Sequence, residues 1–116
     1  MKYMLLIYNQ PGFLDEWSEA DRTELFGEVD TIMKELTESG ELLGGEALAE
    51  PARTRTVRVR DGVPAVTDGP FMEAKEYFAG YLMVECANIE RATEIAARWP
   101  DAKHWAMEVR EVISPG

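Results

Sequence analysis

Residues 68–85 read DGPFMEAKEYFAGYLMVE and set a tight polar turn directly before an apolar strand. Asp68, Gly69 and Pro70 predict the turn, because aspartate bonds to nearby backbone, glycine allows a positive φ, and proline fixes φ and has no N–H for a strand ladder. The strand is predicted over 77–86, where the middle residues are apolar on both faces. Charged side chains crowd the entrance to this strand, and loops held by rigid strands often carry functional sites.

A strand and a helix are predicted at the start of the chain. Residues 2–8 are apolar at both odd and even positions, which indicates a strand that is covered on both faces. Apolar residues then recur at helical spacing from Leu25 to Leu36. Ser18 is the expected N-cap of this helix, and Gly40 is the residue at which it should stop.

The next segment predicts a strand and then a hairpin. The strand covers 42–48 and should be weakened or bulged at Gly44-Gly45. The hairpin pairs 54–60 with 63–67 through Asp61-Gly62, a favoured type I′ turn. A two-residue loop places Val57 opposite Val66 and Arg58 opposite Ala65. The valines then share one face of the hairpin, and arginines line the other.

The chain ends in a second helix and a last strand. Asn88 is the expected N-cap of a helix with a stripe of Ile89, Ala92, Ile95, Ala96 and Trp99, which Pro100 helps to end. The last strand is predicted over 106–113, with Met107, Val109 and Ile113 on its apolar face.

The resulting order is strand, helix, strand, hairpin, strand, helix, strand. It predicts one α+β domain over 1–116, a ferredoxin-like βαββαβ fold with an inserted β-hairpin. Two helices cover only one face of such a sheet, yet strands 2–8 and 81–84 are apolar on both. A bare apolar face is too large a patch for a monomer. We therefore expect a homodimer, with any ligand chamber where the two copies meet.

Several blocks of the chain resemble the DGPF-domain branch of the YCII-related family. They are Asp68-Gly69-Pro70-Phe71 with the following Glu-Ala-Lys-Glu, and residues 1–8, 57–62, 79–85, 96–100 and 108–110. The resemblance implies a ferredoxin-like chain that dimerises as an α/β barrel, and a signalling context, because similar domains occur alongside extracytoplasmic-function sigma factors. Some members are thought to use a His–Asp dyad. No histidine stands at a matching place in this chain, so the dyad is not carried over.

Composition restricts the partners and the compartment. The chain has 22 acidic and 12 basic residues, a net charge of −10. This balance disfavours nucleic acid and anionic membrane as partners, since both attract basic surfaces. The single cysteine, Cys86, allows no intrachain disulfide, and the apolar start is too short for a signal-peptide core. We expect a cytoplasmic protein.

The turn supplies the catalytic candidates, Asp68, Lys75 and Glu76. They could form a binding or acid–base cluster at the mouth of a cavity. The structural alternative is that Asp68 builds the turn while Lys75 and Glu76 are solvated or paired.

The strands supply four ligand-binding candidates, Glu46, Tyr81, Glu108 and Arg110. The charged ones would be half-buried on an otherwise apolar sheet face, and a buried charge needs a partner. They could orient a ligand or form a salt bridge at an interface. His104, the only histidine, could act as an acid or a base, but its place in a short connection beside Trp105 indicates a surface or packing role. No metal-ligand spacing and no phosphate loop stands out, so we expect neither a metal nor another cofactor.

Three functions remain open on the sequence alone. The first is a homodimeric domain that binds a small organic molecule or has a regulatory role. The second is an enzyme of the lyase, isomerase or dehydrochlorinase type that uses a carboxylate for acid–base chemistry in the dimer cavity. The third is a structural dimer without a ligand.

Overall fold

The structure, a computed structural model, describes residues 1–113. Its elements are β1 (Lys2–Asn9), the 3-10 helix η1 (Phe13–Glu16), α1 (Glu19–Ser39), β2 (Leu42–Ala47), the 3-10 helix η2 (Pro51–Arg53), β3 (Arg55–Arg60), β4 (Val63–Asp68), β5 (Tyr77–Glu85), α2 (Ile89–Arg98), α3 (Pro100–His104) and β6 (Ala106–Glu111). Within this part of the chain no helix is long and apolar enough to cross a membrane.

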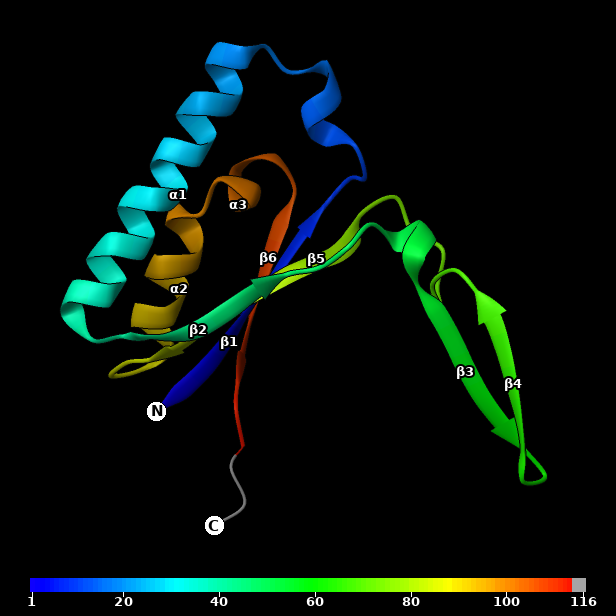
Figure 1. Ribbon diagram of the computed structural model, residues 1–116. Helices are drawn as coiled ribbons and strands as arrows, with labels where there is room; N and C mark the ends of the chain where they lie inside the picture. The colour runs from blue at the N-terminus through cyan, green and yellow to red at the C-terminus, as the bar shows by residue number, and fades with distance from the viewer. Residues whose placement is uncertain (114–116) are drawn as a thin grey trace.

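Four strands form one antiparallel sheet in the order β2-β5-β1-β6, and β3 pairs with β4 in a separate hairpin. With the hairpin set aside, the order β1-α1-β2-β5-α2-β6 is βαββαβ. Both long helices lie on the same side of the sheet, and the hairpin projects from the body as an arm (Figure 1). The predicted ferredoxin-like α+β fold with an inserted hairpin is confirmed.

The predicted helix caps are present. The Asp21 N–H donates to Ser18 Oγ at 3.1 Å, and the Arg91 N–H donates to Asn88 Oδ1 at 2.9 Å. Gly40 ends α1 in the left-handed region with φ 79°. Each of these features needs only nearby residues, so the local sequence suffices to specify it.

The inserted hairpin and the irregular second strand also follow the prediction. Asp61 and Gly62 have φ values of 52° and 77°, as a type I′ turn requires. Val57 lies opposite Val66, and the pairing of β2 with β5 shifts register between Leu42 and Gly44.

The predictions for the C-terminal third need three corrections. Residues 100–104 form a short helix rather than a connection, because Pro100 ends α2 and also suits the first turn of a new helix. Ile89 is 48% exposed, since at 100° per residue it lies about 70° from the centre of the buried stripe of α2. Ile113 lies beyond the end of β6 and is 88% exposed.

The core lies between the helices and one face of the sheet. Leu5 at the centre of β1 is fully buried, and Tyr3 and Val84 lie beside it with at most 2% exposure. The cluster comprises Tyr3, Leu5, Ile32, Leu36, Leu82, Val84, Cys86, Ala92, Ile95, Ala96 and Trp99. Burial also raises the pKa of the Cys86 thiol, which leaves this side chain a small apolar core residue.

The opposite face of the sheet, here called the open face, has no helix over it among residues 1–113 (Figure 1). Alternation along β1 and β5 places Met4, Leu6, Tyr81 and Met83 on this face, all partly exposed. The predicted asymmetry between a covered and an uncovered sheet face is therefore confirmed.

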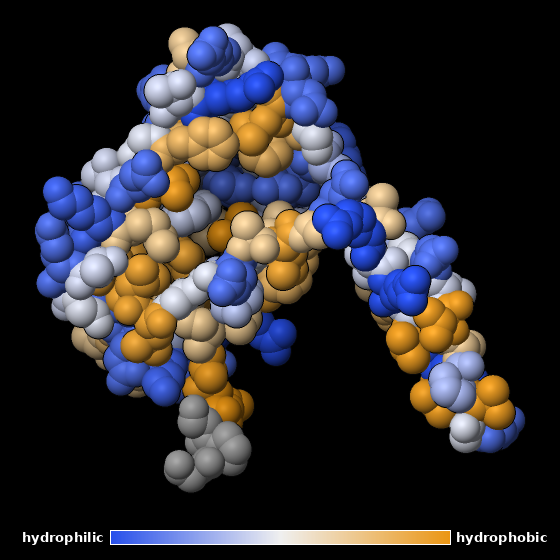
Figure 2. All heavy atoms as spheres, in the orientation of Figure 1, coloured by the Kyte–Doolittle hydropathy of each residue, from blue (hydrophilic) through white to orange (hydrophobic). Residues whose placement is uncertain are grey.

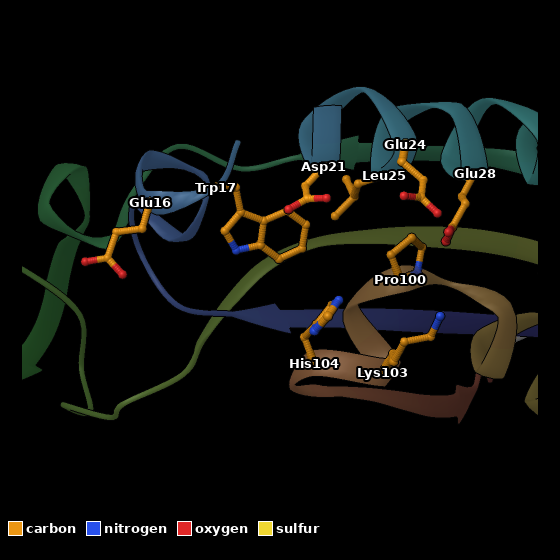
Figure 3. Close-up of a pocket in the computed structure, with 9 residues that line it drawn as sticks. All are labelled: Glu16, Trp17, Asp21, Glu24, Leu25, Glu28, Pro100, Lys103 and His104. Atoms are coloured by element: carbon orange, nitrogen blue, oxygen red, sulfur yellow. The ribbon is translucent and has the colours of Figure 1, made fainter. Parts of the chain in front are cut away.

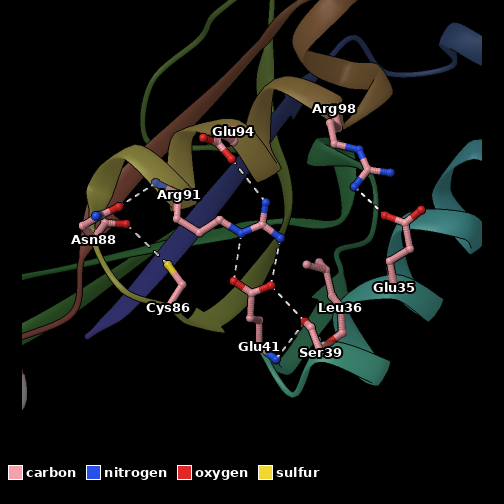
Figure 4. A network of polar contacts seen from close by, with 9 residues as sticks. All are labelled: Glu35, Leu36, Ser39, Glu41, Cys86, Asn88, Arg91, Glu94 and Arg98. Atoms are coloured by element: carbon pink, nitrogen blue, oxygen red, sulfur yellow. Dashed lines mark hydrogen bonds and ion pairs between the residues drawn. The ribbon is translucent and has the colours of Figure 1, made fainter.

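An ion-pair network fastens the start of α2 to the loop after α1 (Figure 4). Arg91 donates to both carboxylate oxygens of Glu41, at 2.9 and 2.8 Å, and to Glu94 at 3.3 Å. The Glu41 side chain is 17% exposed and that of Arg91 35%. The bidentate geometry and partial burial make this pair stronger than an ordinary surface ion pair.

We expect Glu41→Gln to lower the free energy of unfolding by about 1–2 kcal/mol, between the values for exposed and buried charged hydrogen bonds. Arg91 holds the pKa of Glu41 below its ordinary value of 4.5. The stabilisation is therefore present above that value and is lost as pH falls through the lowered pKa. Urea titrations at several pH values measure both effects. The control Glu35→Gln removes the more exposed pair with Arg98 and should lower the free energy of unfolding much less, because solvent screens that pair. Equal losses in the two variants would contradict the argument.

Candidate functional site

A pocket of about 340 Å³ opens between the first half of α1 and the sheet, where the molecule is visibly hollowed (Figure 2). The pocket exists because the strand residues beneath it have small side chains or none. Gly45, Ala47 and Gly80 occupy neighbouring positions on β2 and β5, so little side-chain volume rises from the sheet toward the helix. The apolar side chains above them on α1 therefore line a space instead of filling it.

Two of these positions require glycine. A Cβ at Gly45 would lie 2.5 Å from the carbonyl oxygen of Tyr81, and one at Gly80 would lie 2.7 Å from that of Glu46. Real Cβ atoms do not approach backbone oxygens so closely. The close pairing of β2 with β5 and the depth of the pocket thus depend on the same two residues.

Asp101 is the buried acid of this pocket and is only 6% exposed. It lies in the first turn of α3, immediately after Pro100. The Asn9 side-chain amide, at the end of β1, donates to Asp101 Oδ2 at 3.0 Å and fixes the carboxyl group. Burial raises the pKa of Asp101, and the hydrogen bond from Asn9 opposes that rise only in part.

The remaining wall of the pocket is largely apolar. Its side chains from the loop, the helices and the strands include Ile7, Phe13, Leu25, Phe26, Val29, Met33, Leu82 and Trp99. We call this cavity the Asp101 pocket. An apolar cavity of a few hundred Å³ with one or two fixed polar groups is the usual form of a small-molecule site. A carboxyl group held in such a wall can accept a hydrogen bond from a ligand or exchange a proton with it.

The four predicted ligand-binding residues share the open face of the sheet. The register aligns Glu46, Tyr81, Leu6 and Glu108 in one row across the four strands, and Arg110 follows in the next row beside Met4. Glu46 and Tyr81 also border the Asp101 pocket. The structure therefore brings these candidates together on one surface, where Tyr81 is partly exposed. Glu46, Glu108 and Arg110 are exposed rather than half-buried as predicted, because no element of residues 1–113 covers this face.

The three predicted catalytic residues lie apart from the Asp101 pocket. Asp68 ends β4 at the base of the arm, where its exposed carboxylate lies 4.0 Å from Arg55. The Gly69 N–H donates to the Thr54 carbonyl, and the Thr56 hydroxyl donates to the Gly69 carbonyl, which closes this base. Lys75 is exposed in the loop that leads to β5.

Glu76, the third of these residues, is half-buried and borders a shallow hollow with Tyr8 and Glu108. The interaction with Glu108 is the main cause that raises the pKa of the Tyr8 hydroxyl, and burial adds to it. One catalytic candidate, Glu76, and one ligand-binding candidate, Glu108, thus line the same hollow as Tyr8.

His104 belongs to a cluster of aromatic rings at the end of α3. Its ring lies 5.1 Å from that of Trp17 and 5.5 Å from that of Trp105. It also borders a second hollow of about 410 Å³ between α1 and α3 (Figure 3). Four carboxylates line this hollow, here called the acidic groove: Glu16, Asp21, Glu24 and Glu28. Among residues 1–113, no three side chains of His, Cys, Asp or Glu come together in a way that could hold a metal ion, these four carboxylates included.

Little in the sequence indicated that Asp101 and Asn9 belong to a site. They are 92 positions apart, and Asp101 stands in a stretch that reads as a polar connection. A possible signal was Pro100-Asp101, since proline and an acidic residue are both favoured in the first turn of a helix. Even that signal would have predicted a helix start and not a buried carboxyl group.

Comparison with known proteins agrees with this fold. A family model described as the YCII-related domain matches residues 1–114. The chain belongs to the YCII-related family. A similar member is an uncharacterised protein of Rhizobium meliloti (strain 1021), 28% identical over 96 residues, which are 83% of this chain and 77% of that protein. Membership of the YCII-related family thus accounts for the fold and leaves the function to be argued from the site.

Proposed function

We propose that this YCII-related domain binds a small, largely apolar organic molecule in the Asp101 pocket. The observation that carries the proposal is a carboxyl group, 6% exposed and fixed by Asn9, in the wall of an apolar cavity of about 340 Å³. Keeping a carboxyl group away from water costs free energy, and burial does raise its pKa. A ligand that carries one hydrogen-bond donor would compensate this cost.

The proposal also includes a second copy of the chain on the open face. Its support is the row of partly exposed apolar side chains there, Met4, Leu6, Tyr81 and Met83, which no helix of residues 1–113 covers. A contiguous apolar surface of this kind usually marks an interface. Sedimentation velocity at micromolar concentration should therefore report a dimer, and a monomer would exclude this part of the proposal.

An enzyme is the second candidate, and Asp101 is the observation that favours it. A buried carboxyl group whose pKa is raised above its ordinary value can give a proton to a bound ligand or take one from it. The same ligand would then be a substrate that loses or gains a proton beside Asp101. Turnover of a bound compound, followed by NMR, separates this function from binding alone.

Blocking the pocket tests the proposed function. Ligand-observed NMR with a fragment library of small aromatic and alicyclic amines and alcohols should yield binders. Ala47→Leu places a larger side chain at the exposed rim of the pocket and should abolish their binding while leaving the melting temperature within a few degrees. Ala87→Leu, at an exposed alanine just after β5, is the matched control and should leave binding intact. Fragments that bind equally well to the Ala47→Leu variant would exclude the pocket as their site.

A further inference from the structure

The chain exposes more surface than a compact monomer of its size. Its accessible surface is 8104 Å² for 13.1 kDa, whereas a compact monomer of that mass exposes about 6400 Å². The excess of about 1700 Å² is roughly twice what one partner contributes to a standard protein–protein interface. The radius of gyration, 16.4 Å, also exceeds the value of about 13 Å expected for 116 residues.

Much of this excess comes from the β3–β4 arm, which extends away from the two long helices (Figure 1). Its valines are exposed to solvent. Val57, Val59, Val63 and Val66 are 55–64% exposed, and hydrophobic patches are visible along the arm (Figure 2). An isolated two-stranded hairpin is marginally stable at best. The arm therefore needs a surface to pack against.

The charge of the arm indicates what that surface is. Residues 51–68, which are the arm together with η2 at its base, hold four of the 12 basic residues and two of the 22 acidic ones, a net charge of +2. The other residues hold eight basic and 20 acidic residues, a net charge of −12. Arg58 and Arg60 lie on one face of β3, and Arg58 stacks over the Phe71 ring at 5.4 Å. The arm thus complements the body of its own chain in charge, but points away from it.

The acidic groove supplies the matching surface on the body. Glu24 and Glu28 lie one turn apart on α1 and line this groove together with Trp17, Lys103 and His104 (Figure 3). None of the ion pairs formed by residues 1–113 involves the four carboxylates of this groove. A guanidinium group that entered it would find carboxylates to pair with and a tryptophan ring to stack on.

We propose that the arm of one copy lies in the acidic groove of a second copy, with Arg58 and Arg60 facing Glu24 and Glu28. The exchange is reciprocal, as two-fold symmetry requires. It sets the arginine face of the arm, which also carries Val63, against the groove carboxylates, and leaves Val57, Val59 and Val66 on the opposite face of the hairpin. The proposal concerns the interface only and does not depend on what occupies the Asp101 pocket.

Charge reversal tests this contact by sedimentation velocity. Reversing the arm with Arg58→Glu and Arg60→Glu, or the groove with Glu24→Arg and Glu28→Arg, should weaken self-association by about tenfold or more. Raising the salt concentration should weaken the wild-type association as well, since ion pairs at a partly wet interface are screened. Lys34→Glu with Lys75→Glu, at two exposed lysines on α1 and in the loop before β5, produces the same change in net charge as the arm reversal and should leave association intact.

Combining the reversals gives the decisive result. A chain that carries both reversals restores opposite signs between arm and groove and should associate like the wild type. A mixture of arm-reversed and groove-reversed chains should also associate like the wild type, although each variant alone associates about tenfold more weakly or worse. A monomeric wild type overturns both this proposal and the dimer on the open face. If the arm-reversed chain and the groove-reversed chain each associate as tightly as the wild type, this proposal alone is overturned, and fragment binding to the Asp101 pocket stands in either case.

Discussion

Gly45→Ala should lower the free energy of unfolding by about 3 kcal/mol, near the upper end of what overpacking costs. The added methyl group would lie 2.5 Å from the carbonyl oxygen of Tyr81, 2.9 Å from a methyl carbon of Leu82 and 3.2 Å from the Leu82 Cα. Two of the three obstacles are backbone atoms, which cannot turn aside as a flexible side chain would. Relief therefore requires β2 to move away from β5, which weakens the hydrogen bonds between them.

The neighbouring glycine is a matched control. Gly44 has no atom within 4 Å of an added Cβ, and it faces the opposite side of the sheet. Gly44→Ala should leave stability within about 0.5 kcal/mol of the wild type or raise it slightly, because glycine in a strand costs conformational entropy. Urea unfolding of both variants measures the difference. Similar stabilities for the two alanine variants would show that β2 yields easily and that the close approach is not a constraint.

The contrast between these adjacent residues shows where sequence reasoning stops. The pair Gly44-Gly45 predicts an irregular strand, and the register shift after Leu42 agrees. The sequence does not distinguish the two glycines, because only the packing of β5 against β2 makes one replaceable and the other not. The caps at Ser18 and Asn88 and the turn at Asp61-Gly62 were predictable for the opposite reason: their partners lie within three residues.

The Asp101 pocket required knowledge that no local pattern contains. Its volume comes from small residues on two strands, and its acid comes from a helix that follows β5 and α2. Its orienting amide, Asn9, comes from the first strand. We expected any ligand chamber between two copies on the open face, where Glu46, Tyr81, Glu108 and Arg110 do gather. The cavity with an apolar wall and a buried acid lies on the helix side of the same sheet.

Replacing the buried acid should change both stability and binding. Burial raises the pKa of Asp101 above its ordinary value of 3.8, so the unfolded chain loses this proton at a lower pH than the folded chain does. The folded state is therefore penalised as pH rises through 3.8, and the full penalty applies above the raised pKa. Asp101→Asn, which still accepts from Asn9, should melt higher than the wild type at pH 7. The difference should shrink as pH falls toward 3.8.

The same variant should bind fragments about 30-fold more weakly, the equivalent of about 2 kcal/mol for a hydrogen bond to a charged group. The side chain of asparagine at position 101 has a single oxygen, and Asn9 donates to it. The NH₂ group left for the ligand is a donor, which cannot accept a hydrogen bond from a ligand donor. Asp30→Asn, at an exposed carboxylate on α1, is the control and should change neither property. If Asp101→Asn melts higher yet keeps full affinity, the buried carboxyl group only destabilises the folded state and makes no contact with the ligand. The apolar wall alone then holds the ligand. If it melts lower at pH 7, burial of the charge is compensated within the fold, and the reason for a ligand donor at this position disappears.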